Sequence, residues 1–153
     1  MAKAPAPAAS WHQLAVPDAR CRARWARGTD ATGWAECGRQ WDAVAIDSCT
    51  LGLDALVAMR VGTRSGYPVL ADLLRDLLYV MVAPGTGACA AEVPGVRVLS
   101  AGRYLLMPTT GHGSISAHWI SAPRTTPLRL VDVGQLTHHL IALTDAAHER
   151  AVQ

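Results

Sequence analysis

The sequence predicts an α+β fold: a single domain in which one mixed or mostly antiparallel sheet is covered by helices, with one helix near each end. Three observations lead to this prediction. Apolar residues recur at helical spacing near both ends, and between them lie short apolar runs of strand length that Gly and Pro interrupt. The chain has 153 residues, half of them apolar, which suits one core. We expect residues 1–10 to form a disordered Ala/Pro arm and residues 11–153 to form the domain.

The first predicted helix spans residues 17–27. Pro17 suits an early helical position, Asp18 places a carboxylate in the first turn, and Gly28 is a stop signal. Two faces of this helix differ in character. Cys21 and Trp25 lie four residues apart on one side, whereas the other side carries a basic face made of Arg20, Arg24 and Arg27.

Two strands are predicted next, around residues 33–37 and 41–47, and we expect them to pair as a hairpin. A short helix should follow over residues 51–59, with an apolar stripe formed by Leu53, Leu56 and Val57. A polar turn from residue 63 to residue 66 separates that helix from the next strand, at residues 67–71.

The run at residues 77–83 is apolar throughout, which predicts a strand covered on both faces. Residues 84–87 should end it in a turn. Residues 94–110 are predicted to form a β-hairpin broken at residues 100–102, and another strand is expected at 118–121. Asp132 is the predicted cap of a last helix, whose buried stripe would comprise Val133, Leu136, Leu140, Leu143 and Ala147.

Composition and charge narrow the functional classes. Thirteen Arg accompany a single Lys and Phe is absent, a skew typical of GC-rich, actinobacterial-type coding, so the Arg content by itself says little about nucleic acids. A formal charge of +2 is too small to indicate a nucleic-acid or membrane partner. With no signal-like or membrane-spanning apolar run, we expect a cytoplasmic protein whose four cysteines are buried or free thiols. The tryptophans are expected in the core, except Trp11 in the arm, which could dock on a partner.

Four segments carry a resemblance to a known family: WDAVAID followed by GLDAL, then LLYVMVAPGT, and PGVRVLSAGRYLLMPTT with Trp119 downstream. From Trp41 to about Trp119 the chain resembles the N-terminal catalytic domain of bifunctional DNA primase/polymerases, in the archaeo-eukaryotic primase group, in a small and divergent form. The resemblance covers about half of the chain and consists mostly of hydrophobic spacing.

The same resemblance predicts that the family's chemistry is lost. Members end the first strand with two aspartates one residue apart, which hold a pair of divalent ions. Here Asp47 remains, but Cys49 takes the second position, and a thiol does not suit magnesium. Leu77 stands where the family has a phosphate-contacting His, and Arg97 stands where a further acidic ligand is expected. We therefore expect no templated polymerisation, no bound metal and no cofactor.

Other catalytic patterns are weaker. His112 and His118 flank a serine-containing loop, and either Cys49 or His118 could serve an enzyme of another class. Residues 85–87 resemble a phosphate loop only superficially, because no Lys followed by Ser or Thr comes after them. His138 and His139 are adjacent on a helix and so point in different directions.

Three functional hypotheses result. The leading one is a non-catalytic accessory or regulatory module that binds nucleotide, single-stranded nucleic acid or an acidic protein. The side chains expected to make the contacts are Arg20, Arg24, Arg27, Arg97 and Arg103. The second is a protein-interaction or self-assembling subunit that forms a homo-oligomer through a strand edge or the last helix. The third is the enzyme that would use Cys49 or His118.

Overall fold

The computed structural model describes residues 11–27, 30–62, 65–111, 113–124 and 128–152. The predicted arm at residues 1–10, the helix stop at Gly28, the start of the polar turn at residues 63–64 and His112 lie outside the described residues. The α+β prediction is confirmed, because helices precede, interrupt and follow a set of antiparallel strands.

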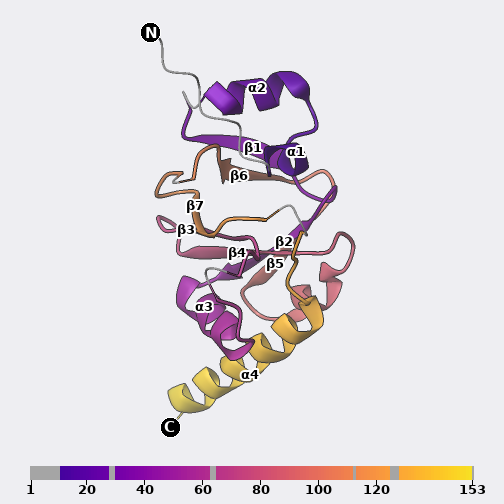
Figure 1. Cartoon of the computed structure of the whole chain (residues 1–153). Helices are drawn as coiled ribbons and strands as arrows, with labels where there is room; N and C mark the ends of the chain where they lie inside the picture. The colour runs from indigo at the N-terminus through magenta and orange to yellow at the C-terminus, as the bar shows by residue number, and fades with distance from the viewer. Residues whose placement is uncertain (1–10, 28–29, 63–64, 112, 125–127, 153) are drawn as a thin grey trace.

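The elements follow one another in the order shown in Figure 1. The helices are α1 (His12–Ala15), α2 (Ala19–Arg27), α3 (Cys49–Ala58), the 3₁₀ helix η1 (Gly87–Glu92) and α4 (Val133–Val152). The strands are β1 (Thr32–Glu36), β2 (Asp42–Asp47), β3 (Val69–Asp72), β4 (Leu77–Val82), β5 (Val96–Leu99), β6 (Tyr104–Pro108) and β7 (His118–Ser121).

The strands form two antiparallel sheets, not the single sheet that was predicted. The larger has the order β5-β2-β4-β3-β7, and the smaller pairs β1 with β6. Both predicted hairpins are therefore wrong. Strand β1 pairs with β6 and not with β2, whereas β5 pairs with β2 and β6 with β1, so residues 94–110 supply one strand to each sheet. The turn at residues 100–102 does form, because the Arg103 amide donates to the Ser100 carbonyl at 3.0 Å.

Helices α3 and α4 cover one face of the larger sheet (Figure 1). Alternate residues of the central strands point into this layer, among them Val44, Ile46, Leu78, Val80 and Val82. Strand β4 is covered on both faces as predicted, because Met81 and half-buried Tyr79 belong to the apolar cluster on the opposite side. Asp132 does cap α4: its Oδ1 accepts from the Gln135 amide at 3.0 Å.

Two predicted stripes need correction. Leu136 and Leu140 are buried as expected, and Val133 and Leu143 are half-buried, but Ala147 is exposed because the last turns of α4 extend past the sheet. In α3 the buried residues are Gly52, Ala55 and Leu56, whereas Val57 is exposed. Gly52 faces the sheet so closely that a side chain at this position would meet Leu78.

The other face of the larger sheet is partly covered by the β1–β6 sheet and the N-terminal helices, and tryptophans dominate this layer. Trp11 is only 5% exposed and packs edge-on against Trp25 and Trp119. The prediction that Trp11 is available for docking is therefore wrong. Trp11 precedes α1, a helix that the sequence did not indicate, and the buried His12 of that helix donates from Nε2 to the Thr109 carbonyl at 3.0 Å.

Asp42, the first residue of β2, joins that strand to two other segments through hydrogen bonds. Asp42 is 1% exposed, and its carboxylate accepts from the Gly85 amide at 2.8 Å and from the Ser100 hydroxyl at 3.0 Å. The first partner lies in the turn after β4 and the second lies after β5. Asp42 thus holds both neighbours of β2 at one end, while Asp47 stands at the other end.

Candidate binding groove

Asp47, Leu77 and Arg97 line one hollow of about 410 Å³ at the end of the larger sheet. Antiparallel register explains why they meet: Asp47 lies opposite Leu77 of β4, while Ala45, two residues earlier, lies opposite Arg97 of β5. Side chains at these positions project from the same face. Arg75 and Gly95 complete most of the lining.

A second hollow of about 360 Å³ adjoins the first, and Arg75 and Arg97 line both. Its apolar wall includes Leu74, Leu99 and Leu106. We call the two hollows together the groove. Besides the residues already named, it is lined by Trp34, Asp72, Tyr79 and Tyr104, and so it runs from the end of β2 to the exposed face of the β1–β6 sheet.

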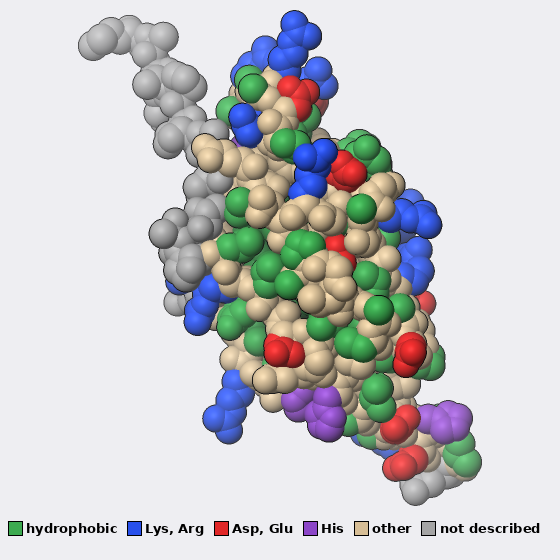
Figure 2. Space-filling model, turned by 90° about the vertical axis from the view of Figure 1, so that its right-hand side faces the viewer, with side chains coloured by type: hydrophobic (Ala, Val, Ile, Leu, Met, Phe, Trp, Pro, Cys, Tyr) green, Lys and Arg blue, Asp and Glu red, His purple; other side chains and the backbone are tan. Residues whose placement is uncertain are grey.

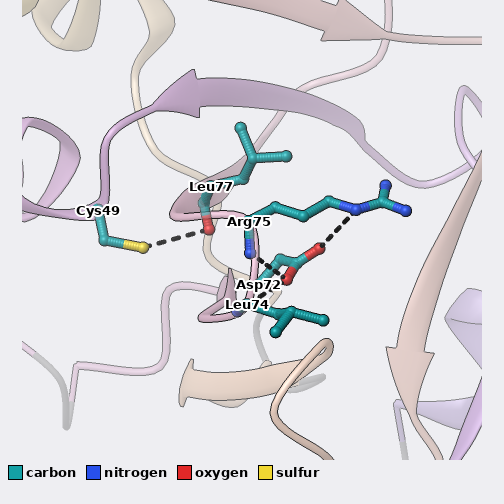
Figure 3. Close-up of polar contacts among 5 residues, drawn as sticks. All are labelled: Cys49, Asp72, Leu74, Arg75 and Leu77. Carbon is teal, nitrogen blue, oxygen red and sulfur yellow. Dashed lines mark hydrogen bonds and ion pairs between the residues drawn. The ribbon is translucent and has the colours of Figure 1, made fainter.

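Arg75 is held at its backbone and exposed at its side chain (Figure 3). The buried Asp72 accepts through Oδ1 from the amides of Leu74 and Arg75, at 3.1 and 3.0 Å. Its Oδ2 lies 3.9 Å from Arg75 Nε, a loose ion pair whose arginine is exposed to solvent and which contributes little stability. The Asp72 turn therefore positions the start of Arg75, while its guanidinium stays available to a ligand.

Arg97 is exposed, and within the described residues its guanidinium makes no hydrogen bond or ion pair. Across the sheet, Ala45 lies between Arg97 on β5 and Tyr79 on β4. Burial raises the pKa of Tyr79, as does the charge of Asp72, while Arg97 and Arg75 oppose this rise. The phenol is therefore uncharged at neutral pH and can act as a hydrogen-bond donor.

Two aromatic rings stand exposed at the other end of the groove. Trp34 of β1 is 65% exposed and Tyr104 of β6 is 60% exposed. In the register of the two strands Trp34 faces Leu106 and Glu36 faces Tyr104, so the two rings are diagonal neighbours on one face. The opposite face of β1 is occupied, because a side chain at Gly33 would meet the Trp25 ring. Trp34 is consequently directed away from the core.

Cys49 lies beside the groove and does not line it. Ser48, between Asp47 and Cys49, has φ 143°, a conformation that L residues rarely adopt, and its Oγ caps α3 by accepting from the Leu51 amide. The chain turns sharply there, and the Cys49 thiol donates to the Leu77 carbonyl at 3.3 Å (Figure 3). Burial, and next the hydrogen bond and charge of Asp76, raise the Cys49 pKa to about 11. Cys49 is therefore a protonated thiol at neutral pH.

The arginines named from the sequence do not gather at one place. Arg97 lines the groove, but Arg20, Arg24 and Arg27 are exposed on α2, and neither they nor exposed Arg103 line either hollow. Figure 2 shows basic side chains concentrated at the end of the molecule where α2 lies. The basic helix and the groove are thus separate features.

Other predicted site residues lie elsewhere. His118 is half-buried at the start of β7, opposite Ala71, and does not line the groove. His138 and His139 lie on α4 with their rings edge to face. Across the described ranges, no three His, Cys, Asp or Glu side chains lie close enough together to hold a metal ion. The four cysteines are free, as expected.

Sequence reasoning missed Arg75, Trp34, Tyr79 and Tyr104. Arg75 lies in a predicted turn and carries no motif, and Trp34 was expected in the core. The alternation of small residues, Gly33 and Ala35, with Trp34 and Glu36 places the two pairs on opposite faces of a strand. It does not show which of these faces packs against the rest of the domain. Of the residues named from the sequence, Arg97 came closest to indicating this site, because it lines the groove together with all four.

No helix in the described part of the chain combines the length and the apolar character needed to cross a membrane. Comparison with models of known protein families, with curated proteins and with solved structures finds no match to this chain. The relationship to primase/polymerases stays a prediction that rests on the motifs quoted above.

Proposed function

We propose that the chain is a non-catalytic accessory or regulatory module that binds a nucleotide or a single-stranded nucleic acid in the groove. One observation carries the proposal: two exposed arginines, Arg75 and Arg97, share a groove with the exposed rings of Trp34 and Tyr104. Guanidinium groups bind phosphate in a fork geometry, and aromatic faces stack on bases of any sequence. Together they match the two parts of a nucleotide.

We further propose that this groove is a degenerate primase/polymerase site. The support is the convergence of Asp47, Leu77 and Arg97 on one hollow. Of these, Asp47 is the only acid, and Arg97 would repel a cation brought there. Under this proposal the groove still binds the phosphates and the base of a nucleotide, although it lacks the paired carboxylates of the polymerases.

Binding of a fluorescein-labelled oligo(dT) of about 12 nucleotides, followed by anisotropy over a salt series, tests this proposal. Arg97→Glu should weaken binding at least tenfold and reduce the slope against salt. Arg24→Glu is the matched control: it reverses the charge of another exposed arginine, on α2, and we expect at most a threefold change. Equal losses in both variants would place the contact on the basic helix or spread it over the surface.

Two more substitutions separate phosphate binding from stacking. Trp34→Ala should weaken binding at least about fivefold at every salt concentration, because stacking contributes roughly 1–3 kcal/mol per base. Asp47→Asn should strengthen binding, because it removes the exposed carboxylate from the hollow that contains Arg97. Unchanged binding in both variants would contradict the proposed groove.

A protein partner is the second candidate function. Leu73, Leu74 and Ile115 are exposed together with Trp34 and Tyr104, and the Leu73 amide donates to the Ile115 carbonyl at 2.8 Å, which joins the two segments. An acidic peptide with apolar anchors, or a second copy of the chain, would suit this surface. Light scattering from dilute to millimolar protein tests self-association, and Leu74→Asp should abolish any dimer found.

We propose no catalytic role for Cys49, since its pKa near 11 keeps the nucleophilic thiolate scarce. We also propose a cytoplasmic location. The support is that all four cysteines are free, as is usual in a reducing compartment.

A further inference from the structure

The groove presents its chemical groups in a definite order. Arg75 and Arg97 line both hollows, so they stand at the boundary between them. The rings of Trp34 and Tyr104 line only the second hollow, whereas Asp47 lines only the first. A nucleotide whose base stacks on the rings and whose phosphate binds the arginines therefore leaves the first hollow to the next unit of the strand. Apart from the two arginines, Asp47 is the only charged side chain that lines this hollow.

The carboxylate of Asp47 has its full hydrogen-bonding capacity available. The residue is exposed at the end of β2, and its backbone amide donates to the Gly95 carbonyl at 2.8 Å, which holds the backbone at this position. Within the described residues the carboxylate makes no hydrogen bond or ion pair. An ionised carboxylate is an acceptor only, so it attracts a hydrogen-bond donor and repels a phosphate.

Strand register places Asp47 one sugar away from a phosphate bound to Arg97. Ala45 lies opposite Arg97, so Asp47, two residues further along β2, is a diagonal neighbour of Arg97 on the same face. Diagonal neighbours across a strand pair lie about 7–8 Å apart. In a nucleic-acid strand the 2′-hydroxyl of ribose is the donor beside the phosphate, whereas the donors of a base lie on its outer edge. A carboxylate at this separation from the guanidinium therefore meets the sugar before the base.

We propose that Asp47 makes the groove select RNA over DNA, by accepting a hydrogen bond from a ribose 2′-hydroxyl in the first hollow. This role rests on the proposed function, because the phosphate held by Arg97 brings the sugar to Asp47. With RNA the hydrogen bond compensates for the repulsion between Asp47 and the phosphates, whereas with DNA only the repulsion is left. One carboxylate thus favours the first strand type and disfavours the second.

Fluorescein-labelled oligo(U) and oligo(dU) of about 12 nucleotides are the probes, because they differ only in the 2′-hydroxyl. In anisotropy titrations the wild type should bind oligo(U) at least about tenfold more tightly, the gain expected from one hydrogen bond to a charged acceptor. A 2′-fluoro oligo(U) keeps the sugar pucker of RNA but has no donor, so it should bind like oligo(dU).

Two substitutions of Asp47 test the residue itself. Asp47→Ala should reduce the preference for oligo(U) to less than about twofold, because it removes both the hydrogen bond and the repulsion. Asp47→Asn retains an acceptor without the charge and should keep a preference of about threefold. Asp54→Ala is the matched control, since it removes an exposed carboxylate of α3 that lines neither hollow and should leave the wild-type preference intact.

The possible failures are distinguishable. Equal binding of oligo(U) and oligo(dU), with both weakened by Arg97→Glu, would overturn the role of Asp47 and leave the proposed function standing. A tenfold preference that persists in Asp47→Ala, or a 2′-fluoro strand that binds like oligo(U), would also overturn that role. If the wild type binds neither strand, the proposed function is refuted and the selection of RNA with it.

Discussion

Replacement of Asp42 by Ala should destabilise the whole domain, because this carboxylate joins the start of β2 to the segments that follow β4 and β5. Hydrogen bonds to a charged acceptor contribute roughly 1.5–3 kcal/mol each, and Asp42 accepts two, from Gly85 and Ser100. Relief of the cost of burying the carboxylate offsets part of that sum. We expect a loss of about 3 kcal/mol in the free energy of unfolding.

Urea unfolding followed by tryptophan fluorescence measures this loss, since Trp41 lies buried directly before Asp42. Ser100→Ala removes only one of the two hydrogen bonds and should cost about 1 kcal/mol. In the double variant the two losses should not add, because Ser100 has no carboxylate left to bind. A loss below 1 kcal/mol for Asp42→Ala, or full additivity, would refute the role assigned to this carboxylate.

Three further predictions concern the tryptophan layer and the site. Burial lowers the pKa of His12 below the ordinary 6.5, so the unfolded chain binds a proton more readily than the folded one. The free energy of unfolding, measured by urea titration, should therefore fall as the pH drops below about 6.5. The wild type and the exposed-histidine control His138→Gln should show this fall, whereas His12→Phe should not. Gly33→Ala should cost about 1–3 kcal/mol and lower Tm, because its Cβ would lie 2.4 Å from Trp25 Nε1, whereas Gly111→Ala, with open space around it, should change Tm little. Iodoacetamide should alkylate Cys49 far more slowly than exposed Cys89 at pH 7, as mass spectrometry of the tryptic peptides would show; equal rates would contradict the raised pKa of Cys49.

The groove shows how far sequence patterns could predict the candidate site. The resemblance assigns Asp47, Leu77 and Arg97 to positions of the family's catalytic site, and in the structure the three line one hollow. Cys49 was expected at the same place but turns toward the Leu77 carbonyl, because the chain reverses at Ser48 to enter α3. A sharp turn moves a side chain to another surface, and residue spacing alone does not record it.

The basic face of α2 illustrates the opposite case. Its arginines recur at helical spacing, so they share a face as predicted, yet that face lies apart from the groove. Arg75 has no pattern of its own and becomes part of the site through the Asp72 turn. Local periodicity identifies which residues lie together on one element, but not which surface that element shares with another.

The sequence by itself determined where most of the helices and strands lie, that β4 is buried on both faces, and that Asp132 caps the last helix. These features depend on neighbours within a few residues, through backbone preferences, side-chain caps and the period of the apolar residues. Only the tertiary structure decided that β5 and β6 belong to different sheets, that Trp11 is buried, and that Trp34 is exposed in a groove that Arg97 also lines. Strand partners and covered faces are set by contacts between residues far apart in the chain, and the groove consists of such contacts.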